Sequence, residues 1–244
     1  VPVDSCPVLV PELESQLPGL PLELEGVEHV RVDLAAGDRG QWAVAPPVGS
    51  LPTGEITVDA AGFTYSYDAR CFFQGHRGLV DDLVSHALGD LEDADGEAYD
   101  LFSGVGLFSL PLSRRYGKVV SVEGDRVAAR FARRNAKSNK AANVEVVVQS
   151  AESWIEHLPK GAARVVVDPP RMGLSDKVRR TLMARKPERL TYVSCEPPTL
   201  ARDLKELGRV FHIDSLTLID MFPQTGHMES VVQLSLPPKE APES

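Results

Sequence analysis

The sequence predicts an α/β protein, with a doubly wound parallel sheet that follows a small N-terminal β-rich subdomain. From Tyr99 onward, short apolar segments alternate with helical segments, which is typical of consecutive βαβ units. Val-Val-Val occurs twice among the apolar segments, as expected for strands that are buried on both faces. The last two apolar segments follow each other without room for a helix, so they should pair antiparallel at one edge of the sheet.

Each strand of this sheet can be assigned to a residue range. We expect strands at 98–102, 118–123, 143–149, 163–168, 189–194, 211–220 and 230–236. Helical segments separate them, among them 126–139 and 174–184. The alternation therefore places the carboxyl ends of several parallel strands at one edge of the sheet.

The N-terminal part has a different pattern, of short strands and turns. The segments 29–34 and 41–46 flank the turn sequence Ala-Ala-Gly-Asp-Arg-Gly. The segments 55–60 and 63–69 flank Ala61-Gly62. Both pairs predict β-hairpins.

A helix and an acidic loop close this first part. Leu79, Leu83 and Leu88 recur at roughly helical spacing and predict a helix. The loop Glu-Asp-Ala-Asp-Gly-Glu at 92–97 indicates a boundary. We expect a β-rich, substrate-side subdomain with its connecting helix at 1–95, a catalytic domain at 96–236 and a disordered tail at 237–244.

Composition excludes several classes of protein. The 244 residues are 43% hydrophobic and 25% charged, as in ordinary globular proteins, and can bury a core without a disulfide or metal staple. No apolar run approaches the ~18 residues of a membrane span, and the acidic, proline-broken start is no secretory signal. The three cysteines, Cys6, Cys71 and Cys195, form no CxxC pair. They favour a reducing compartment, and we expect a cytoplasmic monomer without a membrane partner.

Charge is spread unevenly along the chain. Residues 1–95 hold 17 acids and 4 bases, whereas residues 96–244 hold 18 acids and 22 bases. Nine bases lie within 114–140 and seven within 171–189. Two basic patches on an acidic chain predict either a surface that binds the phosphates of a nucleic acid or two helix faces that are exposed to solvent. Charge alone slightly favours the solvent-exposed helix faces.

A glycine-rich turn follows the first strand of the sheet. Asp100-Leu-Phe-Ser-Gly-Val-Gly lets a ligand approach the backbone, and Gly104 and Gly106 are its glycines. The next strand ends in Glu123, whose carboxylate can accept hydrogen bonds from two ribose hydroxyls. This pattern serves NAD or S-adenosylmethionine. Ser109 at the third position of the G-x-G-x-x-G pattern weakens the dinucleotide interpretation, and the acids before and after the turn favour S-adenosylmethionine.

Three further polar groups fall at the same edge of the predicted sheet. The fourth strand ends in Asp168-Pro-Pro-Arg171 and the fifth in Cys195-Glu-Pro-Pro. The segment that joins the last two strands carries His227 and Glu229, which are unusual in a plain hairpin loop. A cysteine at a strand end is more often a small buried hydrophobic residue than a nucleophile. The polar residues at the neighbouring strand ends nevertheless favour a catalytic role for Cys195.

Five collinear motifs resemble the RNA uracil-5-methyltransferases, bacterial enzymes that make 5-methyluridine in tRNA or rRNA. They are CFFQGHRGLV, DLFSGVGLFSL, VVVDPPRMGL, LTYVSCEPPTLARDL and DMFPQTGHMESVV. The resemblance implies the class I S-adenosylmethionine-dependent methyltransferase fold and methylation of C5 of a specific uridine in structured RNA, with rRNA favoured over tRNA. It also implies the cofactor S-adenosylmethionine.

The chemistry of that family accounts for these residue types. A thiolate that adds to C6 of uracil makes C5 nucleophilic, and a base must later remove the C5 proton. By the resemblance, Cys195 is the nucleophile and Glu229 the base. The remaining roles divide into two sets. We expect the substrate to contact Asp168, Arg171 and an aromatic side chain at Phe72, and the cofactor to contact Gln74, Phe102, Gly104, Gly106, Glu123 and Asp168.

The chain departs from the family pattern in places. His76 replaces the family's Asn, and one of Phe72 and Phe73 is expected in the core. His227 is expected either to position the Glu229 loop or to be an ordinary polar residue. Neither the family's RNA-binding TRAM barrel nor a four-cysteine cluster is visible. Cys6 matches one cluster ligand, but only Cys71 and Cys195 remain, so no iron–sulfur cluster is expected from this chain alone. RNA affinity is expected from the basic catalytic domain or from a missing N-terminal segment.

Other functions stay open at this point. A methyltransferase for a base or small-molecule amine would need neither Cys195 nor Glu229. A non-catalytic RNA- or cofactor-binding relic would tolerate the loss of either residue. An NAD-dependent oxidoreductase is the weakest alternative, because hydride transfer needs no thiolate.

Overall fold

The computed structural model describes residues 5–6, 9–20, 31–89 and 94–237. Its centre is one seven-stranded sheet with the order β10-β11-β9-β8-β5-β6-β7. The strands are β5 (Ala94–Leu101), β6 (Tyr116–Glu123), β7 (Val144–Val148), β8 (Arg164–Val167), β9 (Arg189–Ser194), β10 (His212–Ile219) and β11 (Glu229–Ser235). The strands from β7 to β9 are parallel, and β11 runs antiparallel to both of its neighbours.

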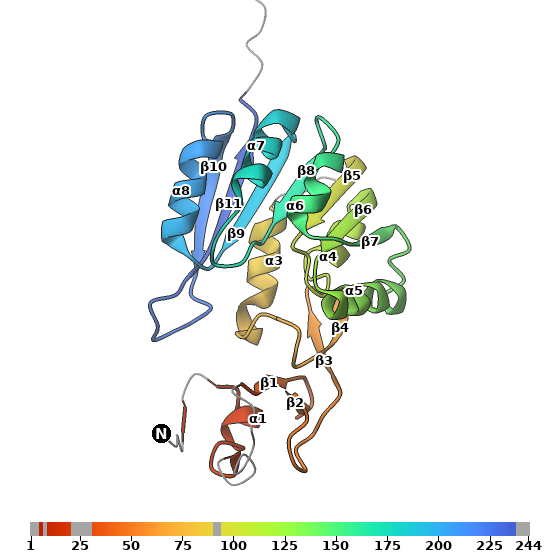
Figure 1. Ribbon diagram of the computed structural model, residues 1–244, viewed down its shortest axis with the longest axis vertical. Coiled ribbons are helices and arrows are strands. Elements are labelled where there is room, and N and C mark those ends of the chain that lie inside the picture. Colours follow the sequence, from red (N-terminus) through yellow and green to blue (C-terminus); the bar gives the residue numbers. More distant parts are fainter. Residues whose placement is uncertain (1–4, 7–8, 21–30, 90–93, 238–244) are drawn as a thin grey trace, which may run out of the picture.

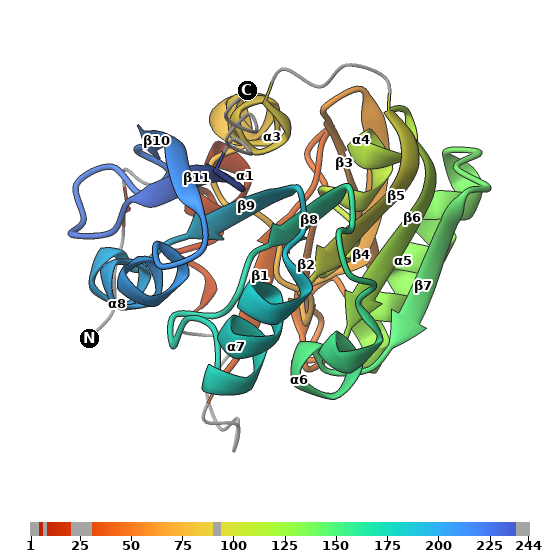
Figure 2. The ribbon, with the colours of Figure 1, turned by 90° about the horizontal axis from the view of Figure 1, so that it is seen from above.

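Helices cover both faces of the sheet (Figure 2). They are α3 (Val80–Leu88), α4 (Ser109–Ser113) and α5 (Arg126–Ser138) on one face, and α6 (Ala151–Trp154), α7 (Asp176–Arg185) and α8 (Pro197–Leu207) on the other. Short 3-10 turns, η1 (Arg77–Leu79) and η2 (Ile155–His157), precede α3 and follow α6. Alternate residues of each strand therefore enter two separate cores, as a doubly wound sheet requires.

The helices begin where the sequence supplies a cap. The Asp125 side chain accepts hydrogen bonds from the first turn of α5, and Ser175 does so for α7. Prolines at the first turn start α8, where the missing N–H costs no helical hydrogen bond. At α5 and α7 the capping side chain therefore fixes the residue at which the helix begins.

The N-terminal part contributes a short helix and two hairpins. Its elements are α1 (Pro11–Glu14), β1 (Asp33–Ala36), β2 (Trp42–Ala45), β3 (Glu55–Ala60) and β4 (Phe63–Asp68). Figure 1 shows α1 and the first hairpin beyond the end of the sheet where the 220–228 loop lies. The second hairpin packs on α5, where the buried Asn135 amide bonds both backbone groups of Ser66 and the carbonyl of Val105.

Most predicted elements are present. All seven strands, both hairpins and the helix after Leu79 are confirmed. The edge pairing of β10 with β11 is confirmed as well. None of the helices in the described part of the chain is long and apolar enough to cross a membrane.

Two boundaries differ from expectation. β5 begins at Ala94, inside the predicted acidic loop, because Ala94 pairs with Tyr116 before an irregularity in the register. The strand therefore crosses the expected division after residue 95. β1 continues through Ala36, because the turn needs only Gly37–Gln41, which a backbone bond from Gly37 N to the Gln41 carbonyl closes. Residues 92–93 of the predicted loop and 238–244 of the predicted tail lie outside the described residues.

Candidate active site

The predicted polar residues gather at the carboxyl edge of the sheet. Strand β6 ends in Glu123, Asp168 follows β8, and Cys195 follows β9. Ser230 pairs with Ser194 in the antiparallel register of β11 and β9, and this pairing brings Glu229 beside Cys195. The order of connections changes between β5 and β8, and ligands bind at such switch points in open α/β sheets.

The glycine-rich turn after β5 is an unusual piece of backbone. Phe102, Gly104 and Gly106 have φ values of 64°, 54° and 96° in the left-handed region. A Cβ at Gly104 would meet no atom within 4 Å, whereas one at Gly106 would lie 3.8 Å from the Cβ atoms of Ala132 and Ser109. Gly104 thus leaves an open side where a ligand can approach the backbone.

Glu123 binds this turn directly. Its Oε2 accepts a hydrogen bond of 2.7 Å from Gly104 N, and its Oε1 accepts one of 2.7 Å from Asp125 N. The carboxylate therefore fixes the distance between the ends of β5 and β6. Each oxygen keeps a second lone pair that can accept from a ligand hydroxyl.

Asp100, before the turn, is completely buried. Its Oδ2 accepts a 2.5 Å hydrogen bond from the Ser109 hydroxyl, and its Oδ1 has no partner. Burial, and then the charge of Glu123, raise the pKa of Asp100 to about 7 in spite of this bond. The sequence interpretation treated Ser109 only as a departure from a glycine pattern and missed its bond to Asp100.

Glu229 and Gln74 form a buried pair. Their exposed fractions are 2% and 4%, although they are far apart in the sequence. The Gln74 amide donates a hydrogen bond to Glu229, yet burial raises the pKa of Glu229 to about 7. Glu229 Oε2 has no partner among the described residues. The carboxyl group can consequently hold or release a proton near neutral pH.

Asp168 is the second carboxyl group of this cluster. Its removal from water, and next the charges of Glu229 and Asp100, hold its pKa well above the usual range. The charges of the other two carboxyl groups therefore act on Asp168. Such a cluster favours the neutral form of at least one of them.

The Cys195 thiol is half-buried and faces opposing charges. Burial, Glu229 and Asp168 raise its pKa, whereas the charge and hydrogen bond of Arg171 lower it. A thiolate at this position depends on Arg171, because the other neighbours disfavour negative charge. Arg171 is the group that sequence reasoning placed on the same loop as Asp168.

A second network holds the Asp168 loop against α8. Asp203 is fully buried and accepts from Leu174 N at 2.8 Å, Tyr192 Oη at 2.7 Å and Arg179 Nη1 at 2.9 Å. Gly173 closes this loop with a φ of 74°. Sequence reasoning missed Asp203. Its signal was an acid that shares the helical spacing of Leu200 and Leu207, both buried on α8.

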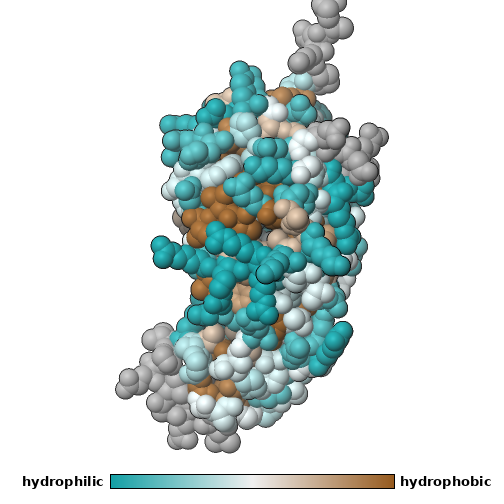
Figure 3. All heavy atoms as spheres, turned by 90° about the vertical axis from the view of Figure 1, so that its right-hand side faces the viewer, coloured by the Kyte–Doolittle hydropathy of each residue, from teal (hydrophilic) through white to brown (hydrophobic). Residues whose placement is uncertain are grey.

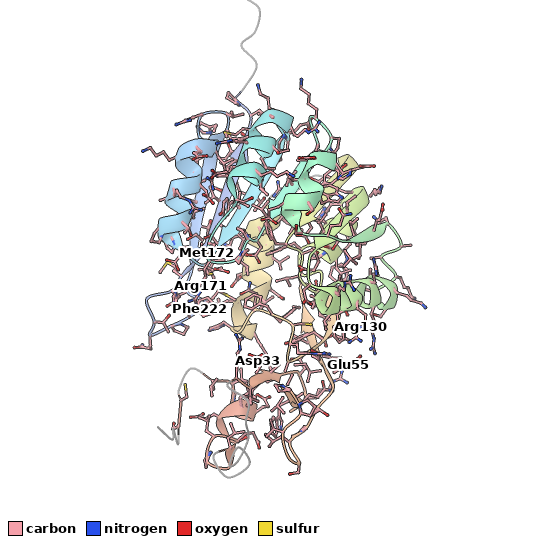
Figure 4. The ribbon with its side chains drawn as sticks, in the orientation of Figure 1. Asp33, Glu55, Arg130, Arg171, Met172 and Phe222 are labelled. Carbon is pink, nitrogen blue, oxygen red and sulfur yellow. The ribbon has the colours of Figure 1, made fainter. Side chains whose placement is uncertain are left out.

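The adjacent aromatic residues divide between surface and core. Phe72 is 68% exposed, whereas Phe73 stacks on Tyr67 with ring centroids 4.9 Å apart. Met172 is 78% exposed, and Figure 4 shows it next to Arg171, on the same side of the molecule as Phe222. The phenylalanines therefore separate as the sequence predicted, one free for a ligand and one packed.

Two histidines have limited contacts. His76, at the family's Asn position, has a buried Nδ1 without a partner. The ring of His227 lies edge-on to Phe222, with centroids 6.3 Å apart, and its backbone N donates to Thr225. No contact with the Glu229 side chain is recorded for His227, so its positioning role stays a prediction.

The basic patches are only partly free for phosphate. Arg179 is buried among Asp176, Asp203 and Glu206, and Arg114 stacks on Phe63 while it bonds the Gly62 carbonyl. The face of α5 and β7 keeps a basic hollow of about 320 Å³ whose cations are Arg133, Lys137 and Lys140. Figure 3 shows hydrophilic side chains across this side of the molecule, between hydrophobic areas.

Comparisons with known proteins agree on one family. The tRNA (Uracil-5-)-methyltransferase profile matches residues 52–236. An uncharacterized RNA methyltransferase of Bifidobacterium longum, BL1394, is 35% identical over 74% of this chain and 44% of its own. The 23S rRNA (uracil(1939)-C(5))-methyltransferase RlmD of Salmonella typhi is 33% identical over 95% of this chain and 63% of its own. The chain thus spans less than two thirds of these relatives.

Solved structures agree with this result. The Pyrococcus abyssi tRNA (uracil-54, C5)-methyltransferase, solved with S-adenosyl-L-homocysteine, has a TM-score of 0.77 and 26% identity, over 96% of this chain and 70% of its own. TYW2 of M. jannaschii, solved in complex with AdoMet, is similar in fold alone, with a TM-score of 0.54 and 16% identity over 80% of this chain and 91% of its own.

Proposed function

Because the chain belongs to the tRNA (uracil-5-)-methyltransferase family, we propose that it methylates C5 of a uridine in RNA with S-adenosylmethionine as the methyl donor. The observation that carries the proposal is the pairing of a half-buried Cys195 with a buried Glu229 at one edge of the sheet. An amine methyltransferase needs neither group, since an amine already has a reactive lone pair.

The residues at the end of β5 fit this cofactor. Gly104 has an open side, and Glu123 sits where two ribose hydroxyls can reach its free lone pairs. Asp100 Oδ1, which is buried and has no hydrogen-bond partner among the described residues, adds an acceptor to the same region. Phe102, Gly104, Gly106, Glu123, Gln74 and Asp168 would hold the cofactor. Bound there, S-adenosylmethionine supplies an electrophilic methyl group.

Cys195 would open the reaction at C6 of the uracil. Its sulfur forms the new S–C6 bond, and the ring electrons move to the C4 carbonyl oxygen, so that C5 becomes a nucleophile. Arg171 stabilises the thiolate against Glu229 and Asp168. The exposed Phe72 can stack on a uridine that has left its helix.

The carboxyl groups would then divide two tasks. Glu229 removes the C5 proton, the electrons of that C–H bond restore the C5–C6 double bond, and the thiolate leaves. A pKa of about 7 suits a base that works near neutral pH. Burial, and then the charges of Glu229 and Asp100, raise the pKa of Asp168 well above its usual value, and in its protonated form this carboxyl group can donate a hydrogen bond to the uracil oxygen that gains charge.

The substrate would be a structured rRNA, acted on by a monomer in the cytoplasm. RlmD of Salmonella typhi, which matches almost the whole chain, is named for a 23S rRNA uridine. The Pyrococcus abyssi structure is a tRNA enzyme, so tRNA is the second candidate. The basic face of α5 offers sites for the RNA backbone in either case.

Mapping of 5-methyluridine tests this proposal. We would compare rRNA and tRNA from a strain that lacks the gene with RNA from its parent, and then restore the missing mark with purified protein. Loss and restoration of one 5-methyluridine in 23S rRNA is the expected result. An unchanged map, or methylation of an amine instead of C5, would contradict it.

A further inference from the structure

A separate cavity of about 320 Å³ opens beside Gln74, between the N-terminal hairpins and the 69–77 loop. Its walls include Leu34, Val58, Tyr67 and Arg77. Among the described residues that line it are none of the three reactive groups Cys195, Asp168 and Glu229. The three reactive groups therefore lie outside this cavity, although Gln74 and Phe72, which the proposed function places at the cofactor and at the target uridine, also border it.

Two buried polar atoms in the residues of this wall lack partners. The Gln74 amide N–H faces Glu229, because a carboxylate only accepts, and this leaves the buried Gln74 Oε1 as an unpartnered acceptor. Arg77 Nη2 is a buried, unpartnered donor, while its Nη1 lies 3.8 Å from Glu12 and 3.6 Å from Asp38. Unpaired buried groups destabilise a fold, so an unpartnered acceptor and an unpartnered donor on two residues of one cavity wall point to a polar ligand.

The rest of the cavity suits a planar aromatic ring. Tyr67 and Phe73 stack on each other within the wall, and Phe72 is largely exposed at the same loop. Arg31 and Arg70 also line the cavity and are 82% and 56% exposed. They pair with acids, but their outward N–H groups remain available to phosphate. A volume of this size accommodates a small ligand.

We infer that this cavity binds the base of a nucleotide next to the target uridine in the same RNA strand. Nucleobase edges place a carbonyl or ring-nitrogen acceptor beside an N–H donor, which complements Arg77 and Gln74. The loop that carries Gln74 reaches both the reactive site and the cavity, so one strand of RNA can fill both. The inference rests on the proposed function and extends it to sequence recognition.

The test combines a filled cavity with RNAs that lack one base. Leu34→Trp introduces a large side chain at a partly buried position of the wall. Leu51→Trp makes the same change at a partly buried position outside the wall and is the matched control. The substrates are synthetic fragments around the mapped uridine, each with an abasic ribose at one position within two nucleotides of the target. The readouts are KM and kcat for methylation.

One abasic position should raise KM of the wild type at least about tenfold, as loss of a stacked and hydrogen-bonded base does. Leu34→Trp should raise KM for the intact RNA to a similar extent. In this variant, KM for the RNA that is abasic at that position should equal KM for the intact RNA. Leu51→Trp should resemble the wild type throughout. Unchanged KM in Leu34→Trp, or two effects that simply multiply, would overturn the inference.

Two controls keep the result interpretable. If Leu34→Trp fails to fold, Arg77→Met enters the same cycle, because the methionine side chain has no N–H donor and leaves the cavity open. If the wild type methylates none of the RNAs, the proposed function fails. In that event the same comparison is made on 23S rRNA fragments around the uridine position named for RlmD, and Kd is measured instead of KM. Effects of the substitution and of the abasic position on Kd that are not additive support binding of a base in the cavity. Additive effects overturn the inference.

Discussion

Gly173 offers a sharp test of how the loop after β8 is held. Its φ is 74°, and an added Cβ would lie 2.6 Å from Asp203 Oδ2 and 2.8 Å from Arg202 Nη2. Alanine at this position would carry about 1–2 kcal/mol of left-handed strain. It would also displace a carboxylate that accepts from Leu174 N and Tyr192, and an unpaired buried group costs about 1–3 kcal/mol. We expect Gly173→Ala to lower the free energy of unfolding by about 2–5 kcal/mol.

Gly161→Ala separates the clash from the strain. Gly161 has a similar φ of 69°, but a Cβ there would meet no atom within 4 Å. This control should lose only about 1–2 kcal/mol. Urea denaturation with linear extrapolation gives both values. Equal destabilisation of the two variants would refute the conclusion that Asp203 clamps the loop.

Three further predictions concern the cofactor, pH and salt. Glu123→Ala should weaken S-adenosylmethionine binding by about 1–3 kcal/mol in calorimetry, because it removes the acceptor for ribose and for Gly104 N, and unchanged affinity would count against the site. The pKa of Glu229 is about 4 in the unfolded chain and about 7 in the folded protein. The contribution of Glu229 to the free energy of unfolding is therefore fully present below pH ~4 and is lost as the pH rises through 7. Denaturation between pH 5 and 8 should therefore show less loss of stability in Glu229→Gln than in the wild type, and equal losses would contradict this. Lys137→Ala should weaken RNA binding and lower the salt slope of log K by about 1, whereas an unaltered slope would identify a solvated face.

Local sequence patterns predict most of the fold. The valine run of β8 identifies a strand that is buried at every position, as expected where both faces of the sheet are covered. The valine run of β7 also identifies a strand, but β7 lies at the edge of the sheet and is only partly buried. The turn after β5 and the Pro-Pro loops were predictable because such loops follow the carboxyl ends of parallel strands. The start of β5 could not be predicted, because Ala94 and its neighbours in the sequence are polar or small. This part of the strand joins the sheet through the pairing of Ala94 with Tyr116.

Long-range polar contacts could not be predicted in the same way. Gln74 and Glu229 meet only because α3 packs against β11 and the loop before α3 is carried with it. A run of basic residues likewise does not predict which arginine side chain is buried. Arg179 is buried because Asp203 and Glu206 lie on the neighbouring helix. The assignment of Cys195 and Glu229 to chemistry came from the family resemblance, and their catalytic roles stay a prediction.

Comparison of Glu229→Gln with Cys195→Ala tests the proposed chemistry most directly. Each purified variant would be incubated with RNA and methyl-labelled S-adenosylmethionine and analysed on a denaturing gel. Glu229→Gln keeps size and polarity but cannot remove the C5 proton, so a labelled protein–RNA adduct should accumulate. Cys195→Ala should give neither adduct nor methylated RNA. Normal turnover by Glu229→Gln, or methylation by Cys195→Ala, would contradict the covalent mechanism.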